Sequence, residues 1–182
     1  MRPDLDHWLA DPAVRVHHGR AARVAPDALW SAAREVRLSD TRTLGRLVRW
    51  RIPGLRPGLE FDTLFRSAPF SVLCDDDGAL VSGLVGRIWT LRRDYPELGD
   101  PEEFRHWSAR GTVRVMLASW VESQPGGAAL FSEARIAPVD REARFGLAAV
   151  RPLIAASQHL VASEGIEAAV RHAERSYRRA RR

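Results

Sequence analysis

The sequence of 182 residues contains no lysine, no asparagine and only one cysteine, and it has no apolar run as long as a membrane-spanning helix. With Cys74 alone, no disulfide can form within the chain, so a reducing cytoplasm is the expected compartment. The first residues, MRPDLDHWLADP, contain early aspartates and no apolar core, so no signal peptide is expected. These absences together favour a cytoplasmic protein without a membrane span.

The positive charge is less informative than its size suggests. All 28 basic residues are arginines, against 23 acidic residues, which gives a net charge of +5. Arginine replaces lysine throughout, as codon usage in a GC-rich genome would produce, so the charge is not taken as a sign of a nucleic-acid partner. Its one concentration is a basic tail at 176–182, which suits the negative end of a helix dipole. We therefore expect no nucleic-acid partner.

Signatures of catalysis and metal binding are lacking as well. The sequence has no G-x-S-x-G, H-x-x-x-H or C-x-x-C pattern. Asp75, Asp76 and Asp77 precede Gly78 and indicate a turn, because a calcium loop needs spaced ligands. The adjacent His17 and His18 would point to opposite faces of a strand, which prevents chelation. We expect neither a metal nor a cofactor.

What the sequence does contain is a series of strand and helix patterns typical of an α+β protein. Its first part predicts a strand over Val14–Val24, a helix over Asp27–Val36 and a second helix that Ser39 or Asp40 caps. Strand signals follow at Phe61–Arg66, at Phe70–Cys74 and, after a turn at 75–78, at 79–91.

The remaining segments include an irregular, charged stretch at 92–108, which could form a flap over one end of the sheet and contains one helical turn at Pro101–Trp107. A long helical pattern starts after Asp140, and Pro152 and Gly165 should kink or interrupt it.

The most informative stretch is a β-hairpin, in which the segments GTVRVMLASWVES and AALFSEARIA flank a Pro-Gly turn. A two- or four-residue loop pairs residues on one nearly apolar face as Val121/Leu130, Ser119/Ser132, Leu117/Ala134 and Val115/Ile136. The opposite face then carries the pairs Trp120/Phe131, Met116/Arg135 and Ala118/Glu133. A three-residue loop would shift this pairing by one. Either face could be turned toward a cavity.

The element order, a strand, two helices, antiparallel strands and a long C-terminal helix, resembles the START-like (SRPBCC) helix-grip superfamily, which includes lipid carriers and polyketide cyclases. Uncharacterised bacterial members share a G-x-x-G-x-x-W strand, here Gly83, Gly86 and Trp89. They also share a T-E-T-R-like strand, here Ser132–Arg135 with serine and alanine in place of the threonines, and an early aromatic in the last helix, here Phe145. The resemblance spans roughly Val14 to Glu174.

This resemblance implies a curved antiparallel sheet wrapped around the C-terminal helix, with two short helices after the first strand. The domain would cover 14–175, after an N-terminal extension at 1–13 and before the tail at 176–182. A cavity between the sheet and the helix would bind a hydrophobic or amphipathic small molecule, lipid-like or polyketide-like. The expected ligand-binding residues are Trp89, Leu117, Ser119, Ser132, Ala134, Phe145 and Leu153.

Two alternatives to a binding protein stay open at this point. An enzyme of the cyclase or dehydratase kind could use Glu133, Arg135 or His106, with His106 placed by the flap at the mouth of the cavity. A homodimer could instead form through an exposed patch made by Trp120, Phe131 and Met116. For Glu133 and Arg135, a salt bridge that stabilises the strand is the simpler interpretation.

Overall fold

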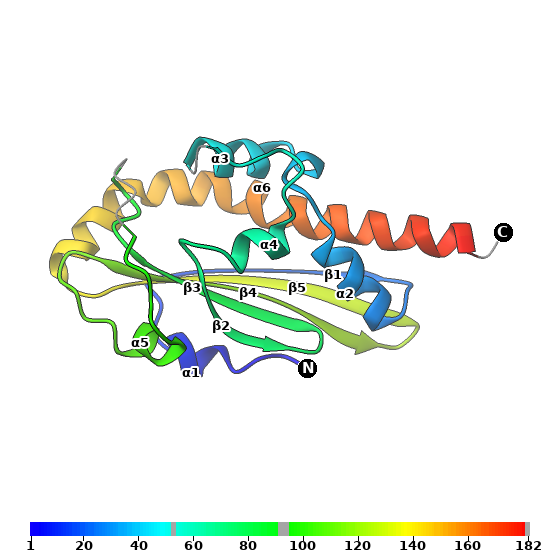
Figure 1. The fold of residues 1–182 in the computed structure, drawn as a ribbon, viewed down its shortest axis with the longest axis horizontal. Helices are drawn as coiled ribbons and strands as arrows, with labels where there is room; N and C mark the ends of the chain where they lie inside the picture. Colours follow the sequence, from blue (N-terminus) through cyan, green and yellow to red (C-terminus); the bar gives the residue numbers. More distant parts are fainter. Residues whose placement is uncertain (52–53, 91–94, 181–182) are drawn as a thin grey trace.

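The computed structural model describes residues 1–51, 54–90 and 95–180, without the side chains of 47, 50, 51, 151–162 and 180. Its centre is a five-stranded antiparallel sheet of order β1-β5-β4-β3-β2 (Figure 1). The strands are β1 Val14–Ala22, β2 Ser71–Asp76, β3 Ala79–Gly86, β4 Val113–Gln124 and β5 Gly127–Pro138. The helices are α1 Leu5–Leu9, α2 Pro26–Arg34, α3 Thr43–Arg51, α4 Phe61–Phe65, α5 Pro101–His106 and α6 Arg141–Ala180, with a 3₁₀ turn at Leu38–Asp40.

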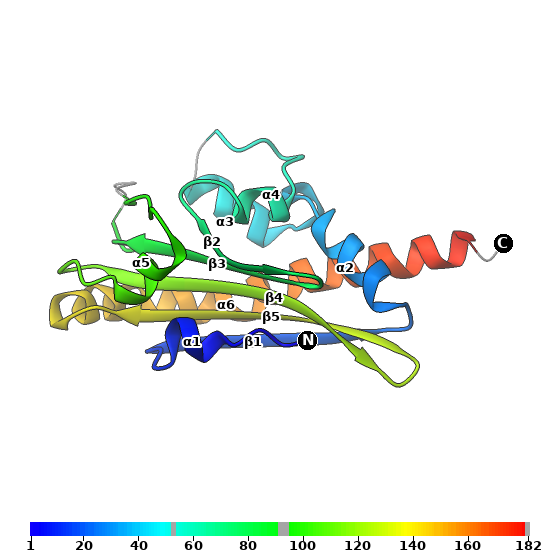
Figure 2. The same ribbon diagram turned by 60° about the horizontal axis from the view of Figure 1, so that its bottom comes forward.

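The elements form layers on the two faces of the sheet. Helix α6, 40 residues long, runs along one face together with α2, α3 and α4, while α1 and α5 lie against the other (Figures 1 and 2). The face toward α6 is called the grip face here, and the face toward α1 the strap face. This arrangement confirms the predicted α+β helix-grip fold.

The hairpin of β4 and β5 has the register that a two-residue turn predicts. Val121 pairs with Leu130, Ser119 with Ser132 and Leu117 with Ala134, and on the opposite face Trp120 pairs with Phe131. The turn is Pro125–Gly126, and Gly126 has φ +82°, a conformation that side-chain-bearing residues rarely adopt. The residues of the first set lie on the grip face, and those of the second set lie on the strap face.

One predicted strand is wrong. Residues 61–66, predicted as a strand, form helix α4 and the residue that caps its C-terminus. Phe61 and Leu64 are buried and Phe65 packs against the same core, so the apolar residues recur at helical spacing. In a run this short, helix and strand periods are hard to tell apart.

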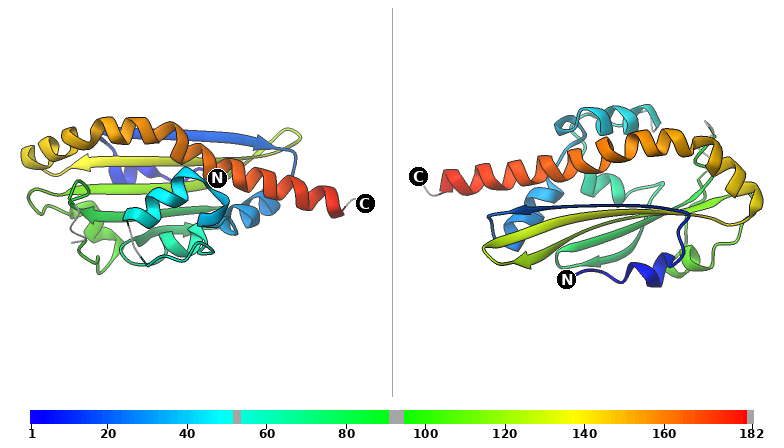
Figure 3. Two further views of the ribbon diagram at one scale, coloured as in Figure 1. Left: turned by 90° about the horizontal axis from the view of Figure 1, so that it is seen from above. Right: turned by 180° about the vertical axis from the view of Figure 1, so that it is seen from behind.

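Other boundaries differ less from the prediction. Strand β3 ends at Gly86, so Trp89 lies in the turn that follows, and Leu91 and the start of the predicted flap lie outside the described residues. The helical turn predicted near Pro101 is α5. Helix α6 continues through Pro152 and Gly165 without interruption, and Figure 3 shows the predicted bend in its N-terminal third.

Helix α3 begins at a side chain of α6 instead of at a local cap. The Glu164 carboxylate accepts hydrogen bonds from the backbone N–H of Thr43 at 2.9 Å and of Leu44 at 3.0 Å. The predicted cap Asp40 accepts from the backbone N–H of Arg37 and closes the 3₁₀ turn. Burial alone would raise the pKa of Glu164, but these N–H groups outweigh it and lower the pKa. The covering helix α3 is thereby attached to α6.

We expect Glu164→Ala to lower the free energy of unfolding by about 1 kcal/mol, the usual cost of losing a helix cap. Hydrogen exchange at the amides of Thr43 and Leu44 should become faster, which mass spectrometry of the exchanging protein measures. Glu167→Ala is the matched control, because Glu167 is on the same helix but makes exposed ion pairs with Arg20 and Arg171. Equal exchange in both variants would contradict the cap.

Candidate ligand-binding site

A cavity of about 450 Å³ lies between the grip face of the sheet and the helices. This volume is within the range of about 300–1,000 Å³ that is usual for small-molecule sites. Its wall is largely apolar and comes from β3, β4, β5, α2, α3, α4 and α6. The larger apolar side chains in it are Trp30, Val36, Leu44, Val48, Phe61, Leu64, Phe65, Phe70, Leu80, Leu84, Ile88, Val115, Leu117, Leu130 and Ile166.

Four of the predicted ligand-binding residues line this cavity together. They are Leu117 and Ser119 of β4 and Ser132 and Ala134 of β5, which alternate with strap-face residues along their strands. The hairpin register thus brings them to one surface, although ligand binding by them stays a prediction.

The opposite wall of the cavity was missed by sequence reasoning. It includes Trp30 of α2, Val48 of α3, and Phe61 and Phe65 of α4. The available signal was the apolar stripe of each short helix, which indicates burial without saying against what. Only the tertiary arrangement shows that these stripes face a cavity.

Among the described residues, the charged side chains that line the cavity are Arg34 and Asp62, and they are paired. Arg34 Nε lies 3.2 Å from Asp62 Oδ1, and Asp62 Oδ2 accepts a hydrogen bond of 2.9 Å from Arg66 Nε. Arg34 and Asp62 both belong to the lining. The ion pair leaves the lining without net charge from these two residues.

Two other predicted ligand-binding residues lie outside the cavity lining. Phe145 is 79% exposed, because Ala143 and Leu147 are the residues at the start of α6 that face the sheet. Trp89 packs on Gly146, where an added Cβ would overlap the indole ring. The aromatic pattern around Trp89 is explained by helix packing at this end of α6. The side chain of Leu153 lies outside the described residues.

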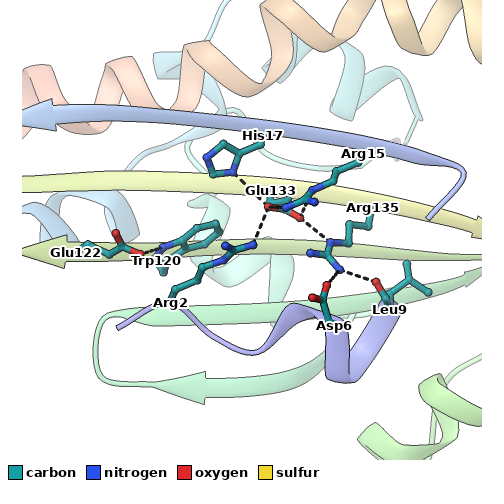
Figure 4. A network of polar contacts seen from close by, with 9 residues as sticks. All are labelled: Arg2, Asp6, Leu9, Arg15, His17, Trp120, Glu122, Glu133 and Arg135. Atoms are coloured by element: carbon teal, nitrogen blue, oxygen red, sulfur yellow. Dashed lines mark hydrogen bonds and ion pairs between the residues drawn. The ribbon is translucent and has the colours of Figure 1, made fainter. Parts of the chain in front are cut away.

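Beneath the strap face, Glu133 and Arg135 form a buried charge network (Figure 4). The Glu133 side chain is 0% exposed and the Arg135 side chain 1%. Arg135 Nε donates to Glu133 at 2.6 Å, and its Nη1 donates to the Leu9 carbonyl at 2.6 Å and to Asp6. Each buried charge therefore has partners, two of which come from the N-terminal segment.

The outer side of Glu133 is held by β1 and by the chain start. Arg15 binds both carboxylate oxygens, with Nε at 2.8 Å from Oε1 and Nη2 at 3.1 Å from Oε2. His17 Nδ1 lies 3.3 Å and Arg2 Nη2 3.7 Å from Oε2. Burial would raise the pKa of Glu133, but the hydrogen bonds and positive charge of Arg15 and Arg135 outweigh it and lower the pKa.

This geometry corrects the predicted roles of Glu133 and Arg135. Both face away from the cavity, across the thickness of the sheet from Ala134, so neither contacts a molecule bound there. The hydrogen bonds of Arg135 to Asp6 and Leu9 attach β5 to α1. Helix α1 belongs to the segment 1–13, which the resemblance places outside the domain. Leu5 and Leu9 of α1 are buried in the same cluster as Met116.

The predicted exposed dimer patch is also wrong. Trp120 is 1% exposed and Met116 is fully buried, because the chain's own N-terminal segment covers them. The Trp120 ring stacks on Phe131 at 5.4 Å between centroids, and the guanidinium of Arg2 lies 5.7 Å from its centroid. These residues pack within one chain.

His106 lies on α5, on the strap side of the sheet, and not at the cavity mouth. Its side chain is 77% exposed, with Nε2 3.8 Å from Glu102. The buried side of α5 is formed by Phe104, which packs under Gly83. Phe104 therefore faces the sheet and His106 faces outward, because they are two positions apart on a helix.

The other reactive groups offer little chemistry. Burial, followed by the nearby Asp76, raises the pKa of Cys74 to about 11, which disfavours the thiolate. Asp75 is paired with Arg66. Within residues 1–51, 54–90 and 95–180, no three His, Cys, Asp or Glu side chains are grouped so that they could hold a metal ion. None of the described helices is long and apolar enough to cross a membrane.

No protein-family model matches the sequence, and no curated protein matches it. Structures similar to the chain include one from Thermus thermophilus, with 8% identity, 90% of this chain and 99% of that chain covered, and a TM-score of 0.38. Another, from Mesorhizobium loti, has 16% identity, coverage of 89% and 98%, and a TM-score of 0.37. Norcoclaurine synthase from Thalictrum flavum has 10% identity, coverage of 94% and 95%, and a TM-score of 0.33. Likeness at this level carries no argument about family or function.

Breaking the Glu133–Arg135 pair should be strongly destabilising. We expect Arg135→Met to lower the free energy of unfolding by about 3 kcal/mol, because it leaves the buried Glu133 charge with fewer partners. The double variant Glu133→Gln/Arg135→Met should cost less than the sum of the single changes. Chemical denaturation of the four proteins measures this coupling, and strict additivity would show that the two side chains do not stabilise each other.

Acid should weaken the same network. Because the pKa values of Glu133 and Asp6 are lowered by folding, their contribution is complete above the ordinary carboxyl values of about 4, and it is lost as the pH falls through the lower folded values. Unfolding free energy measured from pH 6 to pH 3 should decrease in the wild type and decrease less steeply in Glu133→Gln. Parallel curves would exclude Glu133 as a source of acid sensitivity.

Proposed function

We propose that the protein binds a hydrophobic or amphipathic small molecule, lipid-like or polyketide-like, in the cavity between the grip face and α6. The observation that carries this proposal is the cavity itself, with its volume of about 450 Å³ and its mostly apolar wall. Burying apolar ligand surface there would contribute on the order of 25 cal/mol per Å².

The construction of the cavity supports a binding role in a second way. Its floor is a continuous antiparallel sheet, whereas its cover combines α6 with the short separate helices α2, α3 and α4. Among the described residues, α3 is attached to α6 by the hydrogen bonds of Glu164 and by apolar packing. Short elements with few anchors open at lower free energy than a sheet does. A ligand can therefore reach the cavity when the cover moves. The START-like resemblance of the sequence points to the same role, and membership of that superfamily stays a prediction.

No observation favours the enzyme alternative with the residues that the sequence suggested. Glu133 and Arg135 lie under the strap face, and His106 is exposed on α5. A general acid or base must lie within hydrogen-bond reach of the proton it transfers, directly or through one water. None of the three lines the cavity.

Filling the cavity should abolish binding. We expect Ala134→Phe to weaken binding of the neutral fluorescent probe N-phenyl-1-naphthylamine at least tenfold, because the new ring takes the ligand's place. Probe fluorescence titrated with protein measures the affinity. Ala21→Phe is the control, because it makes the same change at an exposed position of β1 on the strap face. If the wild type does not bind the probe, or if both variants bind it equally well, the cavity is not the binding site.

A further inference from the structure

Three serine hydroxyls lie on the grip face among mostly apolar side chains. His18 and Arg20 of β1 lie on the same face, opposite Ser132 and Leu130, and are not among the described lining residues. Ser119 and Ser132 are directly paired across β4 and β5, and both line the cavity. Ser82 of β3 lies between the lining residues Leu80 and Leu84, so it belongs to the same face, but it is buried and is not part of the lining. Ser82 pairs with Leu117, two residues from Ser119 along β4. The three hydroxyls thus form a short row across β3, β4 and β5.

Among the described residues, none of these three hydroxyls has a hydrogen-bond partner. Ser82 is 1% exposed, and its Oγ is the only buried side-chain oxygen or nitrogen without a hydrogen bond in the described part of the chain. No hydrogen bond involves the half-buried Ser119 or Ser132 side chains among the described residues either. Buried polar groups in folded proteins are nearly always paired, so an unpaired one calls for an explanation. For Ser119 and Ser132, which line the cavity, a bound ligand can supply the missing partner.

The charges around the cavity limit what that partner can be. Arg34, the arginine among the described lining residues, is already bound to Asp62, and Asp62 is bound to Arg66 as well. A carboxylate or phosphate placed at the serine row would lose its hydration without meeting an unpaired arginine among the described lining residues. His18, the cross-strand neighbour of Ser132, is not among those lining residues and already has an interaction partner. A neutral oxygen has no such penalty, because a serine hydroxyl can donate to a carbonyl and both donate to and accept from a hydroxyl.

We propose that the cavity selects a neutral amphiphile whose hydroxyl or carbonyl oxygen binds the serine row at Ser119 and Ser132, the two serines that line the cavity, while its apolar body fills the rest. This inference rests on the proposed function and adds the chemical class of the ligand to it. It excludes free fatty acids and phosphorylated lipids that would place their charged group at the row. The site favours uncharged alcohols, ketones and esters.

Three probes with one ring system test this selection. Naphthalene, 2-naphthol and 2-naphthoate compete with N-phenyl-1-naphthylamine for the wild-type protein at pH 8, where histidine side chains are normally neutral. We expect 2-naphthol to bind about tenfold more tightly than naphthalene and than 2-naphthoate. Hydrophobicity alone predicts that naphthalene binds more tightly than 2-naphthol, because the hydroxyl makes 2-naphthol the more water-soluble compound.

Serine variants test where the preference arises. Ser119→Ala and Ser132→Ala should each weaken 2-naphthol binding about two- to tenfold and leave naphthalene binding unchanged. Ser82→Ala should not lower the melting temperature of the free protein, because its hydroxyl has no bond to lose. Ser123→Ala is the control, since Ser123 is on the same face of β4 but outside the cavity lining.

The outcomes separate this inference from the proposed function. If the fluorescent probe binds but naphthalene or 2-naphthoate binds as tightly as 2-naphthol, the cavity is a binding site and the selection is wrong. If the 2-naphthol affinity is unchanged in both Ser119→Ala and Ser132→Ala, the serine row does not bind the ligand's oxygen and the inference is wrong. If the fluorescent probe does not bind to the wild type, the proposed function itself fails.

Discussion

The strict alternation of side chains along the β4–β5 hairpin is the constraint on which the rest of the structure depends. The two-residue turn at Pro125–Gly126 sets one register, and that register sends Leu117, Ser119 and Ser132 to one face and Trp120 and Glu133 to the other. A slip of one residue would exchange the two sets. It would put a buried carboxylate into the apolar cavity and a leucine among arginines. The cavity and the charge network are therefore two results of the same pairing.

The charge network satisfies the two charged side chains that are buried under the strap face. A carboxylate and a guanidinium buried in a sheet cost several kcal/mol of desolvation each unless they are fully bonded. Here β1 supplies Arg15 and the N-terminal segment supplies Asp6 and the Leu9 carbonyl. The segment at 1–13 thus acts as the cover of this face, and its apolar residues Leu5 and Leu9 keep water away from the ion pair. Charge and apolar burial stabilise the same contact.

The parts of the fold that follow from local patterns could be predicted from the sequence. A two- or four-residue loop at the Pro-Gly turn predicts the observed hairpin register, and the grip-face residues Leu117, Ser119, Ser132 and Ala134 follow from that register. The loop length itself, for which three residues were also possible, is decided by the structure. The assignment of residues 61–66 failed because a run of six residues with apolar positions 61, 64 and 65 fits a helix as well as a strand.

The positions of Glu133 and Arg135 relative to the cavity could not be predicted, because they depend on long-range contacts. Both hairpin faces are apolar and carry polar residues, so alternation alone could not show which one faces the cavity. The deciding contact, from Arg135 to Asp6, joins residues 129 positions apart. Phe145 was misplaced for a different reason: α6 presents Ala143 and Leu147 to the sheet, and an aromatic residue two positions away necessarily points outward.

The link between Glu164 and α3 has a consequence for how the sequence can vary. The carboxylate binds backbone N–H groups at positions 43 and 44, which every amino acid except proline possesses. Selection on this contact therefore acts on one partner alone. In related chains that keep the same covering helix, an acidic residue should persist at position 164 while its partners drift freely, so the interaction would leave no trace of paired substitution.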